Sequence, residues 1–241
     1  MKRKRKYDLV IFDFDDTLFD YAKTEAVALK LTLNDLHIEF KNFYQDLFKN
    51  INRQAWDESQ KNDNYDKTML RIKRFETFFQ KIGYDADQET IKKASQLYLD
   101  HSKEGAIIDG VEETIKALSD DGFILVVASS GLSDTRKSKL ENSGLMDYFS
   151  DLFFREAFKP EDLKPNPEFY NFICNKYPRI DRSRIIAVGN SYSNDIVPAK
   201  EAGIETAFFN YFHVLDREID MKYCDCIFES DFRYLLTALY E

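Results

Sequence analysis

Three short apolar runs of this 241-residue chain, at positions 8–12, 123–128 and 184–188, are each followed at once by polar side chains that could do chemistry. In chain order, those side chains are Asp13 and Asp15, Ser129 and Ser130, and Asn190 and Asp195. A lysine before two prolines, Lys164 in "LKPNPEFY", lies between the second and third groups. Carboxylates, hydroxyls and a lysine together suit the binding of a metal ion and of an anion rich in oxygen.

Asp13 and Asp15 are two residues apart in an extended segment, so their side chains project to the same side of the backbone. Two carboxylates this close repel each other, which raises the pKa of one unless a cation lies between them. Oxygen ligands favour a hard cation such as Mg²⁺, and a set without histidine argues against zinc. With Lys164 as a positive charge and Ser129 as a hydroxyl donor, the set suits phosphoryl transfer, which depends on positioning and on stabilising charge.

The apolar runs must position these residues, and their continuous Val, Ile, Leu and Phe composition is typical of buried strands in a parallel sheet. A fourth such run is "ETAFF" at 205–209. Helical patterns lie between the runs, for example over 111–118 and from about Asp195 onward. This alternation predicts an α/β fold with a doubly wound, mostly parallel sheet. In such sheets ligands bind beyond the carboxyl ends of the strands, where the polar residues lie.

The segment 20–104 interrupts the alternation of strands and helices. It contains no strand-like run and is rich in Lys, Asp, Asn and Gln. Because it follows the first strand, it is predicted to be an all-helical cap inserted into a catalytic core made of residues 1–19 and 105–241. Apolar residues at helical spacing mark three stretches of the cap, 28–48, 69–83 and 89–102.

The composition sets limits on function. Apolar residues make up 44% of the chain and charged residues 32%, which excludes a disordered or low-complexity protein. A net charge of -9 repels phosphate backbones and anionic lipid, so polymeric nucleic acid and membranes are not expected as partners. Three cysteines are too few for a disulfide framework, and we expect a reduced, cytoplasmic protein. The sequence does not indicate an oligomeric state.

Four ordered segments resemble the motifs of the haloacid dehalogenase superfamily: "DFDDTLFD", the strand that ends in Ser129, Lys164 before proline, and "VGNSYSNDI". The resemblance covers residues 7–240. Within the superfamily, the cap segments "NRQAWDES" and "LRIKRFETFF" are most similar to the pyrimidine 5'-nucleotidase-like branch. The resemblance implies a Mg²⁺-dependent phosphatase that hydrolyses a small phosphomonoester, such as a nucleoside 5'-monophosphate, through an aspartyl-phosphate intermediate.

The resemblance also implies a role for each matching residue. Asp13 would be the nucleophile that takes up the phosphoryl group. Asp15 would protonate the leaving alcohol and then accept a proton from the hydrolytic water. Ser129 and Ser130 would bind phosphoryl oxygens, and Lys164 would neutralise the nucleophile and the phosphate.

A metal site would include Asp13, the backbone carbonyl of Asp15, and Asn190, with Asp195 as a further ligand or as a support for the others. Asn190 departs from the family pattern, which usually has aspartate there. A carboxamide oxygen still binds Mg²⁺ but carries no charge, so weaker metal binding is expected. Our hypothesis is that Asn190 remains a ligand and that Asp195 supplies the compensating carboxylate.

Two alternatives to a phosphatase remain open at this point. A phosphomutase of the same fold uses the same aspartate pair and differs in whether water or a second hydroxyl attacks the intermediate. A degenerate relative that binds phosphate without catalysis is suggested by Asn190, although Asp13 and Asp15 are both intact. Dehalogenation is disfavoured, because a halide leaving group needs no acid at position 15.

Three cap residues are candidates for substrate specificity. Trp56 could stack on a nucleobase or pack within the cap. Arg53 and Arg74 could contact the distal groups of a substrate, although charges on cap helices are usually solvated.

Overall fold

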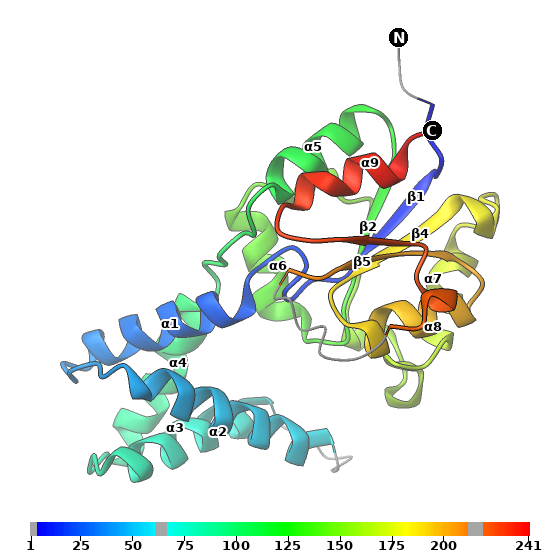
Figure 1. Cartoon of the computed structure of the whole chain (residues 1–241). Helices are drawn as coiled ribbons and strands as arrows, with labels where there is room; N and C mark the ends of the chain where they lie inside the picture. Colours follow the sequence, from blue (N-terminus) through cyan, green and yellow to red (C-terminus); the bar gives the residue numbers. More distant parts are fainter. Residues whose placement is uncertain (1–3, 61–66, 212–218) are drawn as a thin grey trace. The chain divides into compact units, whose positions relative to one another are not determined.

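The computed structural model describes residues 4–60, 67–211 and 219–241, the side chains of 56–60 and 67 excepted. The chain forms two compact units (Figure 1). One contains Met1–Tyr21 and Gly105–Glu241, and the other contains Ala22–Glu104. The first holds a β-sheet flanked by helices, and the second is all-helical.

The first unit is built on a six-stranded parallel sheet in the order β3-β2-β1-β4-β5-β6. The strands are β1 (Leu9–Phe12), β2 (Ile124–Ala128), β3 (Asp151–Phe153), β4 (Ile185–Gly189), β5 (Glu205–Phe209) and β6 (Cys226–Phe228). The predicted doubly wound parallel sheet is therefore confirmed. The four predicted apolar runs form β1, β2, β4 and β5, whereas the short edge strands β3 and β6 were not predicted.

Helices cover both faces of this sheet. They are α5 (Val111–Asp120), α6 (Ser133–Asn142), α7 (Glu168–Lys176), α8 (Val197–Glu201) and α9 (Leu235–Leu239). Val10 and Phe12 of β1 pack in a core with α5 and α9, whereas Leu9 and Ile11 pack with α7 and α8 on the other face (Figure 1). Because both faces are buried, the central strands are apolar throughout and do not alternate with polar residues.

The second unit contains α1 (Tyr21–Asp35), α2 (Phe43–Gln60), α3 (Lys67–Ile82) and α4 (Gln88–His101). The predicted all-helical insertion is therefore confirmed. The continuous helical pattern over 28–48 is divided between α1 and α2, because the chain turns at His37, whose φ of 57° is incompatible with a helix. Aromatic rings fill the core of the unit, with Phe48, Phe75 and Phe78 fully buried.

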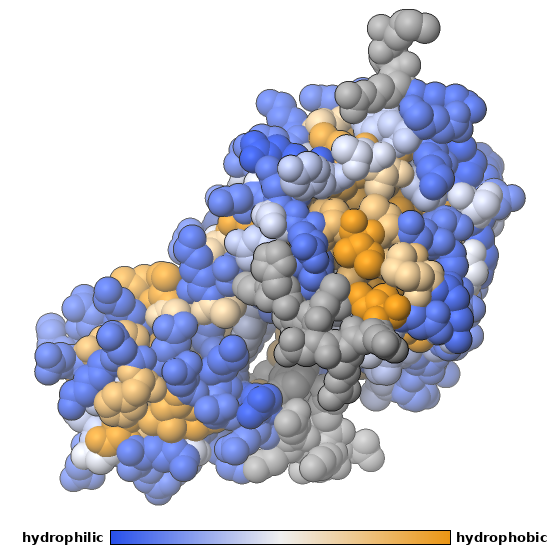
Figure 2. Space-filling model, in the orientation of Figure 1, coloured by the Kyte–Doolittle hydropathy of each residue, from blue (hydrophilic) through white to orange (hydrophobic). Residues whose placement is uncertain are grey.

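Figure 2 shows one face that is largely hydrophilic, with small apolar patches on each of the two units. No helix among the described residues has the length and apolar character needed to cross a membrane.

Candidate active site

The loop after β1 carries Asp13 and Asp15 beyond the carboxyl end of the sheet. The Asp13 amide donates a hydrogen bond to the Val188 carbonyl of β4 (2.9 Å), so the pairing of β1 with β4 continues into the start of the loop. Asp16 then adopts a left-handed conformation, with a φ of 59°, and its carboxylate accepts a hydrogen bond from the Tyr21 amide (2.8 Å). This turn reverses the chain and gives Asp16 a local structural contact.

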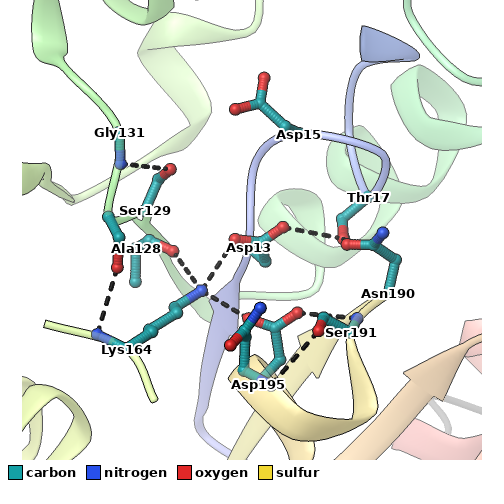
Figure 3. Close-up of polar contacts among 12 residues, drawn as sticks. Asp13, Asp15, Thr17, Ala128, Ser129, Gly131, Lys164, Asn190, Ser191 and Asp195 are labelled. Atoms are coloured by element: carbon teal, nitrogen blue, oxygen red, sulfur yellow. Dashed lines mark hydrogen bonds and ion pairs between the residues drawn. The ribbon is translucent and has the colours of Figure 1, made fainter. Parts of the chain in front are cut away.

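Lys164 links the ends of three strands. Its Nζ donates to Asp13 Oδ1 (2.8 Å), to Asp195 Oδ1 (2.7 Å) and to the Ala128 carbonyl (3.0 Å), as Figure 3 shows. The lysine side chain is only 5% exposed. One buried ammonium therefore joins residues at the carboxyl ends of β1, β2 and β4.

The charged groups in this cluster shift one another's pKa values. Burial, and then the nearby Asp195 carboxylate, raise the pKa of Asp13, while Lys164 acts in the opposite direction. Burial also disfavours the charged form of the lysine, but Asp13 and Asp195 outweigh it, and the pKa of Lys164 is raised well above its ordinary value. Lys164 thus remains a cation beside Asp13.

Ser129 and Ser130 follow β2. Ser129 is buried, and its hydroxyl accepts a hydrogen bond from the Gly131 amide (3.2 Å). The Ser130 hydroxyl accepts from the backbone amide of Lys164 (3.2 Å). In both contacts the serine oxygen is the acceptor, so each hydroxyl keeps its own proton for another acceptor.

Thr17 brings Asp13 and Asn190 together. Its hydroxyl lies 3.2 Å from Asp13 Oδ2 and 3.2 Å from Asn190 Oδ1. Since one hydroxyl carries one proton, the two oxygens share it. The Asp13 carboxylate, which follows β1, and the Asn190 carboxamide, which follows β4, therefore both face the Thr17 hydroxyl (Figure 3).

Asp195 lies on the turn after β4 and is only 2% exposed. Its Oδ1 accepts from Lys164, and its Oδ2 accepts from the Ser191 amide (2.9 Å). Gly189 makes room for it, because a Cβ at that position would lie 2.5 Å from the carboxylate. Asp195 therefore holds the lysine and the turn in place.

The residues at the strand ends fit a magnesium ion by the chemistry of their donors. Asp13 offers a carboxylate oxygen, Asn190 a carboxamide oxygen and Asp15 a backbone carbonyl, and oxygen is the ligand that Mg²⁺ prefers. Among the described residues there is no group of three or more His, Cys, Asp and Glu side chains able to hold a metal. A metal here would therefore use the carboxamide and backbone oxygens as well as carboxylates.

Two cations on α6 that contact the site were not predicted from the sequence: Arg136, which is largely buried, and Lys139, which is buried. Arg136 forms an ion pair with Asp15 Oδ2, donates to the Leu132 carbonyl (3.0 Å), and lies 5.7 Å from the centre of the Phe14 ring. Lys139 is only 4% exposed. The segment "DTRKSKL" has the composition of a solvated helix face, so the sequence offers no signal for this burial.

The three specificity candidates belong to the helical unit. Arg53 is exposed on α2, whereas Arg74 donates to Asn52 Oδ1 (2.6 Å) and lies 5.2 Å from the centre of the Tyr98 ring. The side chain of Trp56 lies outside the described residues. Contact of these three residues with a substrate stays a prediction.

A doubly wound parallel sheet with an inserted helical unit, and with a carboxylate and a lysine paired at the strand ends, is an arrangement suited to phosphoryl transfer. Comparison with known proteins gives the family. The family model described as haloacid dehalogenase-like hydrolase matches residues 7–203, and the chain belongs to this family.

Relatives match nearly the whole chain. The HAD-hydrolase YfnB of Bacillus subtilis (strain 168) is 28% identical over 206 residues, which cover 86% of this chain and 85% of YfnB. Pyrimidine 5'-nucleotidase PynA of Streptococcus pneumoniae (strain ATCC BAA-255 / R6) is 26% identical over 208 residues and 86% of each chain. The crystal structure of magnesium-bound YfnB superimposes with a TM-score of 0.76 at 27% identity, over 98% of this chain and 99% of that one.

These matches confirm the resemblance to the haloacid dehalogenase superfamily and to its pyrimidine 5'-nucleotidase-like branch. The chain is an enzyme of the phosphoric monoester hydrolase class.

Proposed function

We propose that this enzyme is a Mg²⁺-dependent phosphatase that hydrolyses a small phosphomonoester, of the nucleoside 5'-monophosphate class, through an aspartyl-phosphate on Asp13. The observation that carries the proposal is the contact of the buried Lys164 ammonium with Asp13 Oδ1 (2.8 Å). It keeps a cation beside the nucleophile, at a strand end where an anion can also be held.

In the first half of the reaction a carboxylate oxygen of Asp13 attacks phosphorus, and the bond to the leaving oxygen breaks. Asp15 gives the leaving oxygen a proton. In the second half Asp15 accepts a proton from water, whose oxygen attacks phosphorus and releases Asp13. Mg²⁺, held by Asp13, the Asp15 carbonyl and Asn190, would neutralise part of the charge on the phosphoryl oxygens.

The hydroxyls after β2 supply the remaining donors. Ser129 and Ser130 each accept from a backbone amide, which orients the hydroxyl and leaves its proton for a phosphoryl oxygen. Lys164 adds a positive charge, while its three N–H groups are donated to Asp13, Asp195 and the Ala128 carbonyl. Donors fixed before the substrate arrives stabilise the charge of the transition state without reorganisation.

The nucleotide class of substrate is supported by two relatives. PynA and YjjG of Escherichia coli (strain K12) are both named pyrimidine 5'-nucleotidases, and each matches over 86% of this chain. A phosphoglycolate phosphatase of Vibrio vulnificus (strain YJ016) is 33% identical, but the match covers only 57% of this chain. The longer matches include the helical unit, which favours nucleotides.

The test is turnover of p-nitrophenyl phosphate with Mg²⁺, followed by a panel of nucleoside 5'-monophosphates, phosphoglycolate and sugar phosphates. We expect phosphate release that is lost in Asp13→Asn, with the nucleotides as the preferred substrates. Chromatography of the sugar phosphates distinguishes a mutase, which would return an isomer instead of free phosphate. No turnover of any ester by the wild-type enzyme would contradict the proposal and favour a binding protein.

The position of Asn190 has its own test. Asn190→Asp adds a carboxylate at the proposed metal site and should lower the Mg²⁺ concentration needed for half-maximal activity. An unchanged Mg²⁺ requirement would show that the residue does not contact the metal.

A further inference from the structure

Arg136 is held rigidly against the loop that contains Asp15. Its guanidinium pairs with Asp15 Oδ2, donates to the Leu132 carbonyl (3.0 Å) and lies over the buried Phe14 ring at 5.7 Å. The arginine side chain is 15% exposed. A cation fixed by two contacts besides the ion pair itself defines one position for the carboxylate that it binds.

This position is away from the nucleophile. Figure 3 shows the Asp15 carboxylate directed away from Asp13, although the two residues are on one loop. Among the described residues no donor contacts the second oxygen, Asp15 Oδ1. Arg136 therefore binds one oxygen of Asp15 and leaves the other for a further partner.

We propose that Arg136 is a positioning residue, which holds Oδ2 of Asp15 so that Oδ1 can give a proton to the leaving oxygen of the substrate. This inference rests on the proposed phosphatase function. In an in-line phosphoryl transfer the attacking and leaving oxygens lie on opposite sides of phosphorus. The acid must therefore be separated from Asp13, and the contact with Arg136 keeps it apart.

The neighbouring cations do not provide the same contact. Lys164 attracts carboxylates to the nucleophile and would draw an unheld Asp15 toward Asp13. Lys139 lies 5.8 Å from the centre of the Phe14 ring, and none of the described residues offers its ammonium a hydrogen-bond acceptor. Arg136 is the cation that touches Asp15.

Gly131 allows this arrangement and provides a second way to disturb it. A Cβ at Gly131 would overlap the Arg136 guanidinium. The φ of Gly131 is outside the left-handed region, so alanine fits the backbone. Gly131→Ala should therefore displace the guanidinium from Asp15 without changing any charge.

The test compares two leaving groups, because nitrophenolate leaves without a proton whereas the alkoxide of a nucleoside 5'-monophosphate needs one. The quantity measured is kcat/KM, which reports the steps up to formation of the aspartyl-phosphate. In Arg136→Gln and Gly131→Ala we expect kcat/KM to fall about 10- to 100-fold for the nucleotide and less than about threefold for p-nitrophenyl phosphate. Lys137→Gln, an exposed cation on the same helix, should change neither.

A double-mutant cycle that combines Arg136→Gln with Asp15→Asn separates positioning of Asp15 from a merely structural effect. If Arg136 acts through Asp15, then Arg136→Gln should cause no further loss of nucleotide turnover in the Asp15→Asn background. Arg136→Lys keeps the charge and should restore part of the wild-type ratio between the two substrates. Equal losses for both substrates, or additive losses in the double variant, would overturn the inference.

The outcomes also distinguish this inference from the proposed function. Wild-type turnover of both esters that depends on Asp13, with an unchanged leaving-group ratio in Gly131→Ala and Arg136→Gln, would refute only the role of Arg136. No wild-type turnover would refute the phosphatase proposal and the role of Arg136 with it. If Arg136→Gln does not fold, the ratio measured in Gly131→Ala and Arg136→Lys decides.

Discussion

Replacing Asp195 by asparagine should destabilise the protein and lower its activity without changing the affinity of the enzyme for Mg²⁺. Both partners of the carboxylate are donors: the Lys164 ammonium at 2.7 Å and the Ser191 amide at 2.9 Å. A carboxamide offers one acceptor oxygen and one donor group, so one of the two contacts becomes donor against donor. The residue is 2% exposed, and water cannot easily repair the loss.

The magnitude follows from two opposing effects. A buried donor left without an acceptor costs about 1–3 kcal/mol. Breaking a buried ion pair costs about 3–5 kcal/mol when the partner charge is left alone, but Asp13 still neutralises Lys164. Losing the Asp195 charge also removes its repulsion of Asp13. We therefore expect a decrease of roughly 2–3 kcal/mol in the free energy of unfolding.

Urea unfolding in EDTA measures this decrease, and Mg²⁺ titration of turnover measures metal binding. We expect kcat/KM to fall about 10- to 100-fold, because Lys164 loses the contact that aligns it with Asp13. The half-saturating Mg²⁺ concentration should stay within about twofold, since the carboxylate of Asp195 is buried and faces Lys164 and the Ser191 amide. Asp147→Asn, at an exposed position, is the matched control.

Two results would refute this reasoning. An unfolding free energy within about 0.5 kcal/mol of the wild type would show that the asparagine satisfies both donors. A roughly tenfold higher Mg²⁺ requirement would show instead that Asp195 binds the metal directly, as the sequence analysis left open.

Three further substitutions test other parts of the structure. Gly189→Ala places a Cβ 2.5 Å from the Asp195 carboxylate and should cost about 1–3 kcal/mol in urea unfolding together with activity; unchanged values would show that the turn shifts freely. Burial opposes ionisation of Asp225, but Lys200 (2.7 Å) and the hydrogen bonds from Thr206 together outweigh it, and the pKa of Asp225 is lowered. The stabilisation by the ionised carboxylate is therefore present above pH about 4 and is lost as the pH falls further. Asp225→Asn should therefore lower the Tm at pH 7 more than at pH 3, and an equal effect at both would contradict the ion pair. Phe75→Ala empties a fully buried site in the helical unit and should lower the unfolding free energy of that unit by about 3–5 kcal/mol, a loss that circular dichroism in urea would detect or exclude.

The strands that could be predicted from the sequence are those buried on both faces. In β1, Leu9 and Ile11 pack on one side and Val10 and Phe12 on the other, so the strand is an unbroken apolar run. The edge strands β3 and β6 are three residues long and only partly buried, and β3 begins at the exposed Asp151. These strands form by pairing with β2 and β5, and the local sequence pattern carries no information about that pairing.

For the candidate site, the position of a residue could be predicted from the sequence where that residue follows a buried parallel strand. Asp13, Ser129 and Asn190 each directly follow such a strand, and the parallel topology brings them to one edge of the sheet. The position of Arg136 could not be predicted, because its guanidinium lies between the Phe14 ring and the space left by Gly131. These two residues are far apart in the sequence. The helix segment that contains Arg136 has the composition of a solvated surface.

The substitution of asparagine at position 190 is consistent with the charges around it. Four carboxylates and three cations lie at this end of the sheet: Asp13, Asp15, Asp16 and Asp195, with Lys164, Arg136 and Lys139. The carboxylates already outnumber the cations by one, and an aspartate at position 190 would add a further negative charge, which Asn190 avoids. Under the proposed function, Mg²⁺ and a phosphomonoester of charge about -2 together add no net charge to the site. Either one alone would add an uncompensated charge to a largely buried site, so we expect metal and substrate each to strengthen the binding of the other.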